Sequence, residues 1–354
     1  MRPLALPGRR DVSATRQLAN PHSPAKTKLA LANAGLSQPM LHRILLCASL
    51  LGGALFLPPV PLASAQMPPD VAARVRALGR NIDEAATAAI YAPLHAGRER
   101  YADVNIVRDL RYGPDPRHAL DIFTTAAGGM PRPVFVFLHG GGFVSGDRRI
   151  AEAFYDNVGV WAARNGMVGV NMTYRLAPAH PWPAGAEDAA AAVAWLRDKI
   201  AAHGGDPARI FLAGHSAGAA HIADYIAFPG LHPAPGGPAI KGALLLSGIF
   251  DVARFPRYPF MRAYYGDNPP PRADQSRLNG LVRADIPFFV AHAELDPPDF
   301  VVESKALNEA LCRERRCPRF AEFVGHNHVS EIYAIDTSDT AISDIMLEFV
   351  KGVK

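Results

Sequence analysis

Arg209-Ile-Phe-Leu-Ala213 runs directly into Gly214-His215-Ser216-Ala217-Gly218. The first stretch is mostly apolar, which is typical of a buried strand. The glycines of the following G-x-S-x-G pattern permit a sharp turn from strand into helix, and such a turn leaves the Ser216 hydroxyl exposed. A serine that caps a helix in a glycine-rich turn gives the same letters. The position directly after a strand nevertheless predicts a nucleophile elbow with Ser216 as the nucleophile.

A second glycine motif, His139-Gly140-Gly141-Gly142-Phe143, follows another apolar run that ends at Leu138. Consecutive glycines let backbone N–H groups face an oxyanion with no side chain in the way. We therefore predict an oxyanion hole formed by the amides of Gly141, Gly142 and Ala217. The alternatives are a flexible loop or a phosphate cradle, and no Lys-Ser/Thr pair follows the glycines to support a cradle.

Short apolar runs alternate with longer amphipathic stretches through the rest of the chain. This alternation predicts an α/β fold, in which a mostly parallel central sheet carries helices on both faces. The predicted strands are 133–138, 167–172, 209–213, 241–246, 287–291 and 319–324, with an antiparallel strand at 119–125. The predicted helices are 150–164, 186–202, 301–315 and 341–350, with one or two short cap helices within 67–105 and a substrate-shaping insertion at 252–285.

A nucleophilic serine needs a general base, and the base needs an orienting acid. In an elbow of this kind the acid and then the histidine follow the serine, each after a strand. The loop after the 287–291 run offers three acids, and the loop after the 319–324 run offers two histidines. The acids are Glu294, Asp296 and Asp299, and the histidines are His326 and His328. Spacing alone does not choose among them.

The motifs together resemble a known family. The HGGGF motif, Tyr174–Ala184 with the acids Glu187 and Asp188, and the GHSAG motif stand in the order found in the α/β-hydrolase superfamily. The chain resembles the hormone-sensitive-lipase-like and feruloyl-esterase-like bacterial carboxylesterases over roughly residues 101–350. The resemblance implies an α/β-hydrolase fold and a position for Asp188 that braces it; the same residue also suits the first turn of a helix.

The same resemblance selects the acid and the base. Ala293-Glu-Leu-Asp-Pro297 is similar to the acid loop of the family, which assigns the acid to Asp296. His328-Val-Ser-Glu331 is similar to the base motif of the feruloyl-esterase-like and arylformamidase-like branch, which favours His328 over His326. The implied catalytic residues are Ser216, Asp296 and His328.

The implied activity is hydrolysis of small carboxylic esters through an acyl-enzyme, with no cofactor and no metal. Two alternatives stay open. An amide or formamide hydrolase of the arylformamidase-like kind would use the same triad, and a catalytically silent binding protein could keep the same fold. The sequence says nothing about the oligomeric state.

The first 65 residues differ in charge from the rest. They carry seven basic residues and one acidic residue, whereas the remainder carries 30 basic and 32 acidic residues. Within them, Met40–Arg43 is a short positive start, 44–57 is apolar, and Ala63-Ser64-Ala65 is a small-residue cleavage site. These parts predict a signal peptide at about 40–65 and an exported, periplasmic or secreted protein, with a single hydrolase domain at 66–354. Residues 1–39 are interpreted as an over-extended start.

The uneven charge removes the basis for nucleic-acid binding. The sequence pI of about 9.0 reflects the leader, and no basic stripe or zinc-ligand spacing accompanies it. The apolar run 44–57 is also too short for a membrane span, so none is expected after signal cleavage.

The chain has three cysteines, of which Cys47 lies in the leader. Cys312 and Cys317 are therefore expected to pair in an oxidising compartment, the alternative being two free thiols.

Overall fold

The computed structural model describes residues 67–353 apart from 98, 100, 127–130, 151–152, 233–236 and 268–270, and for 271–276 it describes the backbone alone. Backbone contacts divide the chain into Met1–Pro59 and Val60–Lys354, and the described residues belong to the second unit. The predicted leader, its signal segment at about 40–65 and Cys47 lie outside the described residues.

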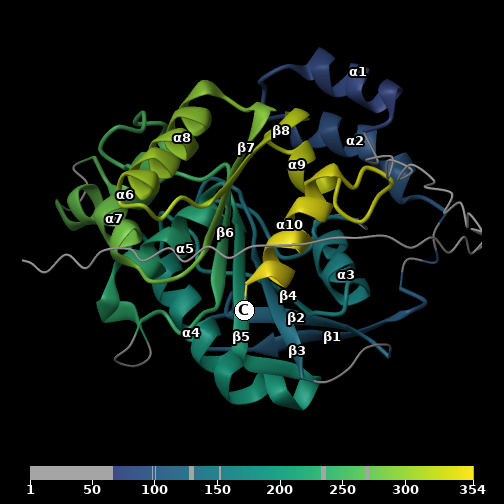
Figure 1. The fold of residues 1–354 in the computed structure, drawn as a ribbon, viewed down its shortest axis with the longest axis horizontal. Helices are drawn as coiled ribbons and strands as arrows, with labels where there is room; N and C mark the ends of the chain where they lie inside the picture. The colour runs from purple at the N-terminus through teal and green to yellow at the C-terminus, as the bar shows by residue number, and fades with distance from the viewer. Residues whose placement is uncertain are drawn as a thin grey trace, which may run out of the picture. The chain divides into compact units, whose positions relative to one another are not determined.

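The described residues form an eight-stranded sheet in the order β1-β2-β4-β3-β5-β6-β7-β8 (Figure 1). β1 pairs antiparallel with β2, and β2 pairs antiparallel with β4, whereas all later pairs are parallel. The predicted antiparallel strand at 119–125 and the mostly parallel sheet are confirmed. The strands are β1 (Val104–Arg111), β2 (Ala119–Thr125), β3 (Arg132–Leu138), β4 (Val168–Met172), β5 (Gly205–His215), β6 (Gly242–Leu246), β7 (Phe288–Leu295) and β8 (Arg319–Asn327).

Helices cover both faces of this sheet (Figure 1), as predicted. One face packs against α4 (Ala184–Lys199), α5 (Ala217–Ala227), α7 (Pro271–Arg283) and α8 (Pro298–Arg313). The other packs against α1 (Pro69–Leu78), α2 (Glu84–His95), α3 (Asp156–Arg164) and α10 (Ala341–Gly352). The remaining helices are α6 (Pro259–Tyr265), α9 (Ser330–Tyr333), and the short 3-10 turns Ile200–His203 and Pro229–Leu231.

The period of two along each strand explains the division of the core. In β3, Val134, Val136 and Leu138 belong to one cluster, whereas Phe135 and Phe137 belong to the cluster on the opposite face. A central strand buried on both faces has no polar side, which is why 133–138 is a continuous apolar run in the sequence. The same physics accounts for β5 and β6.

The ends of several predicted elements were wrong. The helix expected at 150–164 begins at Asp156, and the one expected at 186–202 begins at Ala184 and tightens into a 3-10 turn after Lys199. The strand expected at 209–213 extends over Gly205–His215. The segment 67–105 holds two short helices, α1 and α2, as expected, and β1 begins near its end at Val104. The insertion at 252–285 contains α6 and α7.

The structure has a disulfide between Cys312 and Cys317, the pair named from the sequence. It joins the last turn of α8 to the residues that lead into β8. Within the described part of the chain, no helix is both long enough and apolar enough to cross a bilayer.

Candidate active site

Ser216 lies where β5 turns into α5, with backbone angles of φ 55° and ψ −118°. A positive φ is unusual for a residue with a side chain, and such strain persists only where the surroundings impose it. The Ser216 amide donates to the carbonyl of Leu246 at 2.9 Å, which anchors the turn to β6. Ser216 therefore adopts the predicted elbow conformation.

The two glycines that flank the turn are required by close packing. A Cβ on Gly218 would lie 2.2 Å from the Leu138 carbonyl oxygen at the end of β3. A Cβ on Gly214 would lie 2.6 Å from the amide nitrogen of Ala219 in the following helix. Both contacts are with backbone atoms, which a side chain could not displace. The helix and strands approach so closely that the first and last positions of G-x-S-x-G must be glycine.

The glycine loop after β3 faces Ser216. Gly141 and Gly142 have φ of 113° and 57°, and a Cβ on Gly141 would collide with the Ser145 carbonyl. Their amides, and that of Ala217, donate none of the loop and cap hydrogen bonds formed among the described residues. All three residues line the same pocket as Ser216. These are the three amides predicted to form an oxyanion hole.

Tyr174 holds this glycine loop in place. Its hydroxyl donates to the His139 carbonyl at 2.7 Å, and its ring stacks on the His139 imidazole with centroids 4.3 Å apart. Burial lowers the pKa of His139 to about 4, so this ring is neutral at ordinary pH. The histidine of the HGGGF motif therefore has a packing role, in which its ring and carbonyl contact Tyr174.

Asp188 secures the segment that carries Tyr174. Its carboxylate accepts from the Arg175 amide at 2.6 Å, from Arg175 Nε at 2.8 Å and from His118 Nε2 at 2.9 Å. It is 1% exposed. An acid that only complemented a helix dipole would need none of these contacts, so Asp188 has the bracing position that the resemblance implied.

Asp296 and His328 form a buried pair at the carboxyl ends of β7 and β8. His328 Nδ1 donates to Asp296 Oδ1 at 2.7 Å. Of the candidates from the sequence, these are the two in direct contact. Glu294 instead accepts from the Gly325 amide and lies near Arg76, whereas Asp299 accepts from the Tyr258 hydroxyl.

Ser247, at the end of β6, completes the surroundings of the acid. Its hydroxyl donates to Asp296 Oδ2 at 2.6 Å, and the Ala293 amide donates to the same oxygen at 2.8 Å. Burial by itself would raise the pKa of Asp296, but the hydrogen bond and charge of His328, with these two donors, hold it below its usual value. The carboxylate is therefore ionised where it contacts the imidazole.

His326 lies away from this pair. It is buried, its Nδ1 is 3.2 Å from the Ser330 hydroxyl, and its Nε2 faces Asp339 at 3.5 Å. Burial lowers the pKa of His326 to about 3, so it stays neutral in the interior. It is not among the residues that line the pocket around Ser216.

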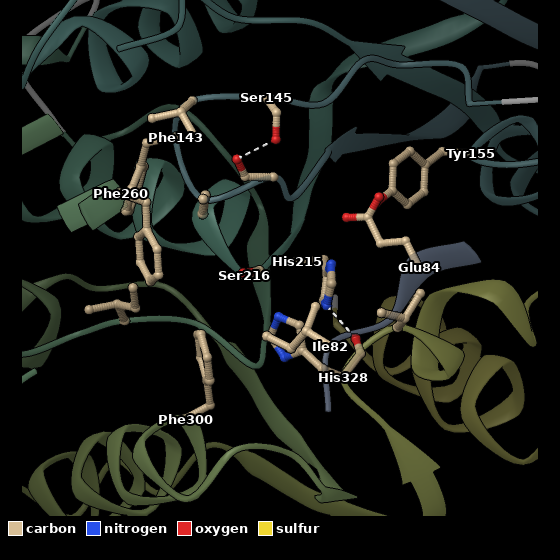
Figure 2. Close-up of a pocket in the computed structure, with 16 residues that line it drawn as sticks. Ile82, Glu84, Phe143, Ser145, Tyr155, His215, Ser216, Phe260, Phe300 and His328 are labelled. Carbon is tan, nitrogen blue, oxygen red and sulfur yellow. Dashed lines mark hydrogen bonds between the residues drawn. The ribbon is translucent and has the colours of Figure 1, made fainter. Parts of the chain in front are cut away.

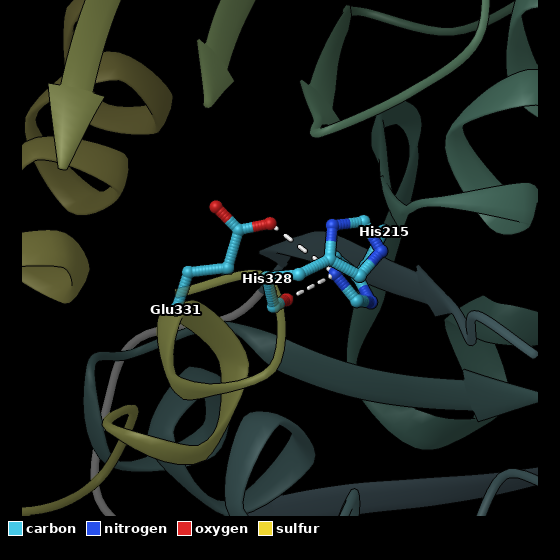
Figure 3. Close-up of side chains that lie close together, drawn as sticks. All are labelled: His215, His328 and Glu331. Carbon is cyan, nitrogen blue, oxygen red and sulfur yellow. Dashed lines mark hydrogen bonds and ion pairs between the residues drawn. The ribbon is translucent and has the colours of Figure 1, made fainter. Parts of the chain in front are cut away.

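His215 and Glu331 lie beside His328 (Figure 3). His215 Nε2 lies 2.7 Å from the carbonyl oxygen of His328 and 3.2 Å from Oε1 of Glu331. Since a carbonyl can only accept, Nε2 carries the proton. Burial lowers the pKa of His215 to about 4 and raises that of Glu331 well above its usual value, with repulsion from Asp296 adding to the latter. The His215 imidazole is therefore neutral at neutral pH, and the Glu331 carboxyl holds its proton more tightly than a solvent-exposed glutamic acid does.

Within the described residues, His215, His328 and Glu331 are also the set whose ligand-type atoms lie within 4.8 Å of one another. One nitrogen of each histidine is already used, because His328 Nδ1 contacts Asp296 and His215 Nε2 contacts a carbonyl. This is a hydrogen-bonded arrangement, and we assign no metal to it.

A pocket with a cavity volume of about 250 Å³ opens over Ser216 and His328 (Figure 2). Phe260 and Phe300 lie to one side of Ser216 in this view, and Glu84 and Tyr155 to the other. A cavity of this size suits a small ester.

Among the aromatic residues of the insertion 252–285, Phe260 lines this pocket. Tyr258 is 41% exposed. Phe255, Tyr264 and Tyr265 instead belong to the hydrophobic core.

Comparison with solved structures places this arrangement among known folds. The chain superposes on Esterase B from Lactobacillus rhamnosis with a TM-score of 0.64 and 19% identity, over 80% of this chain and 95% of the other. It superposes on an esterase of the bacterial hormone-sensitive lipase family with a TM-score of 0.58 and 23% identity, over 80% and 97%. Residues 135–278 match a family model described as the alpha/beta hydrolase fold. The chain has the α/β-hydrolase fold. This is the fold that the resemblance implied.

The chain is also similar in sequence to a curated esterase. Esterase LipQ of Mycobacterium tuberculosis is 32% identical over 223 residues, which cover 57% of this chain and 52% of the relative. The chain thus spans about half the length of that curated relative.

Three residues near Ser216, Asp296 and His328 were not predicted from the sequence. They are Ser247, Glu84 and Tyr155. Ser247 had a detectable signal, because it follows the predicted strand 241–246 at the edge of the sheet where the site forms. Glu84 and Tyr155 come from segments remote from every motif, and nothing in the sequence connects them to Ser216.

Proposed function

We propose that the protein is a serine carboxylesterase with Ser216 as nucleophile, His328 as base and Asp296 as orienting acid. The observation that carries the proposal is the 2.7 Å contact between Asp296 and His328, where His328 lines the same pocket as the strained Ser216. The esterase relatives and neighbours support the same activity. Each component has a defined role in acyl transfer.

In the first step, His328 Nε2 takes the Ser216 proton while Oγ attacks the ester carbonyl. The ionised Asp296 keeps the other imidazole proton on Nδ1 and stabilises the imidazolium that forms. The carbonyl electrons move onto oxygen, where the amides of Gly141, Gly142 and Ala217 stabilise the charge.

In the second step, His328 gives its proton to the departing alkoxide, which leaves as the alcohol. An ester now joins the acyl group to Ser216 Oγ. Water then attacks this acyl-enzyme with His328 as base, and the carboxylic acid departs as Ser216 regains its proton. The substrate partner is therefore a small ester.

The test is hydrolysis of p-nitrophenyl acetate by the purified protein and by Ser216→Ala. We expect Ser216→Ala to lose at least about a thousandfold in kcat while keeping its thermal unfolding temperature. A fluorophosphonate probe should label the wild type and leave Ser216→Ala unlabelled. Turnover retained in a cleanly purified Ser216→Ala would refute the proposal, and an unreactive wild type would indicate a silent binding protein.

The leaving group needs a separate comparison, because the same triad serves amide chemistry. An acetyl ester, a feruloyl ester and N-formylkynurenine should be offered side by side. We expect the acetyl ester to be preferred. A higher kcat/KM for N-formylkynurenine would reassign the protein as a formamide hydrolase.

We also propose that the protein is exported, with cleavage after Ala65. The signal-like segment supports this, as does the Cys312–Cys317 disulfide, since disulfides persist in oxidising compartments. N-terminal sequencing of the processed protein should begin at Gln66. Alkylation without reduction should leave both cysteines unmodified, whereas alkylation of both would argue for export without the bond or for a reducing compartment.

A further inference from the structure

The pocket over Ser216 has one carboxylate in its wall. Glu84 is the first residue of α2, it is exposed, and it makes no ion pair with another described residue. No described residue lining the pocket is a lysine or an arginine. The lining histidine His215 is neutral, since burial lowers its pKa to about 4. The described lining of the pocket therefore carries one carboxylate and no lysine or arginine.

The charge of Glu84 acts on two residues of the pocket wall. Burial dominates the pKa of both His215 and Tyr155, and the negative charge of Glu84 pushes both pKa values upward. In Figure 2 its carboxylate points toward the Tyr155 hydroxyl, on the far side of His215 from Ser216. That hydroxyl has no hydrogen-bond partner among the described residues and also lines the pocket. A substrate group on the Glu84 side of the pocket would therefore face the Glu84 carboxylate and the Tyr155 hydroxyl.

The position of Glu84 indicates which half of the substrate it meets. The segment from Arg80 to Glu84 joins α1 to α2, and the Arg80 guanidinium donates to the backbone carbonyl of Asp296. The segment therefore runs beside the Asp296–His328 pair. Because His328 must hand its proton to the departing alkoxide, the alcohol half of the ester lies on the His328 side. The glycine loop, with Phe260 beside Gly142, lies on the side of Ser216 away from His328 (Figure 2).

Resting on the proposed esterase function, we propose that Glu84 is a specificity-determining residue that favours esters whose alcohol half carries a positive charge. A cationic leaving group, such as a quaternary ammonium two carbons from the ester oxygen, gains attraction from Glu84. An uncharged alcohol of the same shape gains none, and an anionic alcohol is repelled. Because Glu84 is exposed, water and salt screen the attraction, so the preference is moderate and falls as ionic strength rises.

The experiment compares two substrates that differ only in charge. Acetylcholine and 3,3-dimethylbutyl acetate have the same shape, and acid release measures the kcat/KM of each. In Glu84→Gln the ratio of acetylcholine to the neutral ester should fall about three- to tenfold relative to wild type. Asp70→Asn is the matched control, because Asp70 is also an exposed acid in the first turn of a helix, α1. That variant removes the same charge and should keep the wild-type ratio.

An unchanged ratio in Glu84→Gln would overturn the inference, and so would an equal fall in Asp70→Asn, which would mean that net charge alone acts. A second pair tests the side: p-nitrophenyl esters of 4-(trimethylammonio)butyrate and of 5,5-dimethylhexanoate carry the difference on the acyl half. A Glu84→Gln response confined to this pair would overturn the assignment of Glu84 to the alcohol half.

If the wild type hydrolyses neither 3,3-dimethylbutyl acetate nor p-nitrophenyl acetate, the proposed esterase function itself fails. Turnover with no charge preference refutes the role of Glu84 alone.

Discussion

The Ser247 hydroxyl donates a 2.6 Å hydrogen bond to Oδ2 of Asp296, while His328 Nδ1 contacts the other oxygen of that carboxylate. Ser247 is itself held at the end of β6, where its amide donates to the Ala291 carbonyl of β7 at 2.9 Å. One carboxylate thus joins the ends of β6, β7 and β8. This connection orients the acid, and through it the base.

Ser247→Ala should weaken catalysis without unfolding the protein. It removes one donor to a buried carboxylate, so the pKa of Asp296 should rise and its hold on His328 should loosen. Hydrogen bonds to charged groups contribute about 1.5–3 kcal/mol, so we expect kcat/KM for p-nitrophenyl acetate to fall about tenfold or more. Ser304→Ala is the control, because Ser304 is also buried but donates to a backbone carbonyl instead. An equal loss in both variants would contradict a role through Asp296.

The two buried carboxyl groups beside His328 should respond differently to amide substitution. Asp296→Asn places the wrong group against Nδ1 and should lower kcat by about 10⁴-fold. Burial raises the pKa of Glu331 and so favours its uncharged form, which Glu331→Gln replaces with a neutral amide. We therefore expect its pH–rate profile to keep the wild-type acidic limb. A limb displaced to lower pH would show that Glu331 is ionised in the active protein.

Substitution of His326 in β8 and of His328 directly after it should separate catalysis from packing. His328→Ala should abolish hydrolysis of short esters. His326→Ala should retain most activity and instead lower the unfolding temperature, because it empties a buried site that contacts Ser330. Steady-state kinetics and thermal unfolding of both variants provide the test. Comparable loss of activity in the two would leave the choice of His328 without support.

Glu303 should make the stability depend on pH. This carboxyl is 3% exposed and accepts from the Phe250 and Asp251 amides. Burial raises its pKa from 4.5 to about 7. Because the folded state binds this proton more tightly than the unfolded state, its contribution to stability is complete below about pH 4.5 and is lost as pH rises through 7.

The matching variant is Glu303→Gln, which keeps an acceptor and cannot titrate. Its free energy of unfolding, relative to wild type, should increase by about 3 kcal/mol between pH 4 and pH 8. Urea unfolding at several pH values measures this difference. A difference that stays constant with pH would show that Glu303 titrates near its ordinary value in the folded protein.

Much of the fold could be predicted from the sequence, because burial restricts which residues a central strand can contain. Strands buried on both faces must be apolar throughout, so β3, β4, β6 and β7 stand out as short runs. Element ends were less predictable. The extension of β5 depends on a partner that lies elsewhere in the chain, because Gly205 pairs with Arg132 of β3.

The sequence by itself determined the elbow and the glycine loop, because close backbone approach at Gly214, Gly218 and Gly141 allows no side chain. It also confined the acid and the base to two short loops. The choice between candidates came only from a resemblance, and the contact that joins Asp296 to His328 exists only once β7 and β8 pair. Ser247, Glu84 and Tyr155 meet the site through tertiary structure alone. Hydrogen bonds and electrostatic fields act through space, and the distance in space between residues far apart in the chain is set by the packed fold.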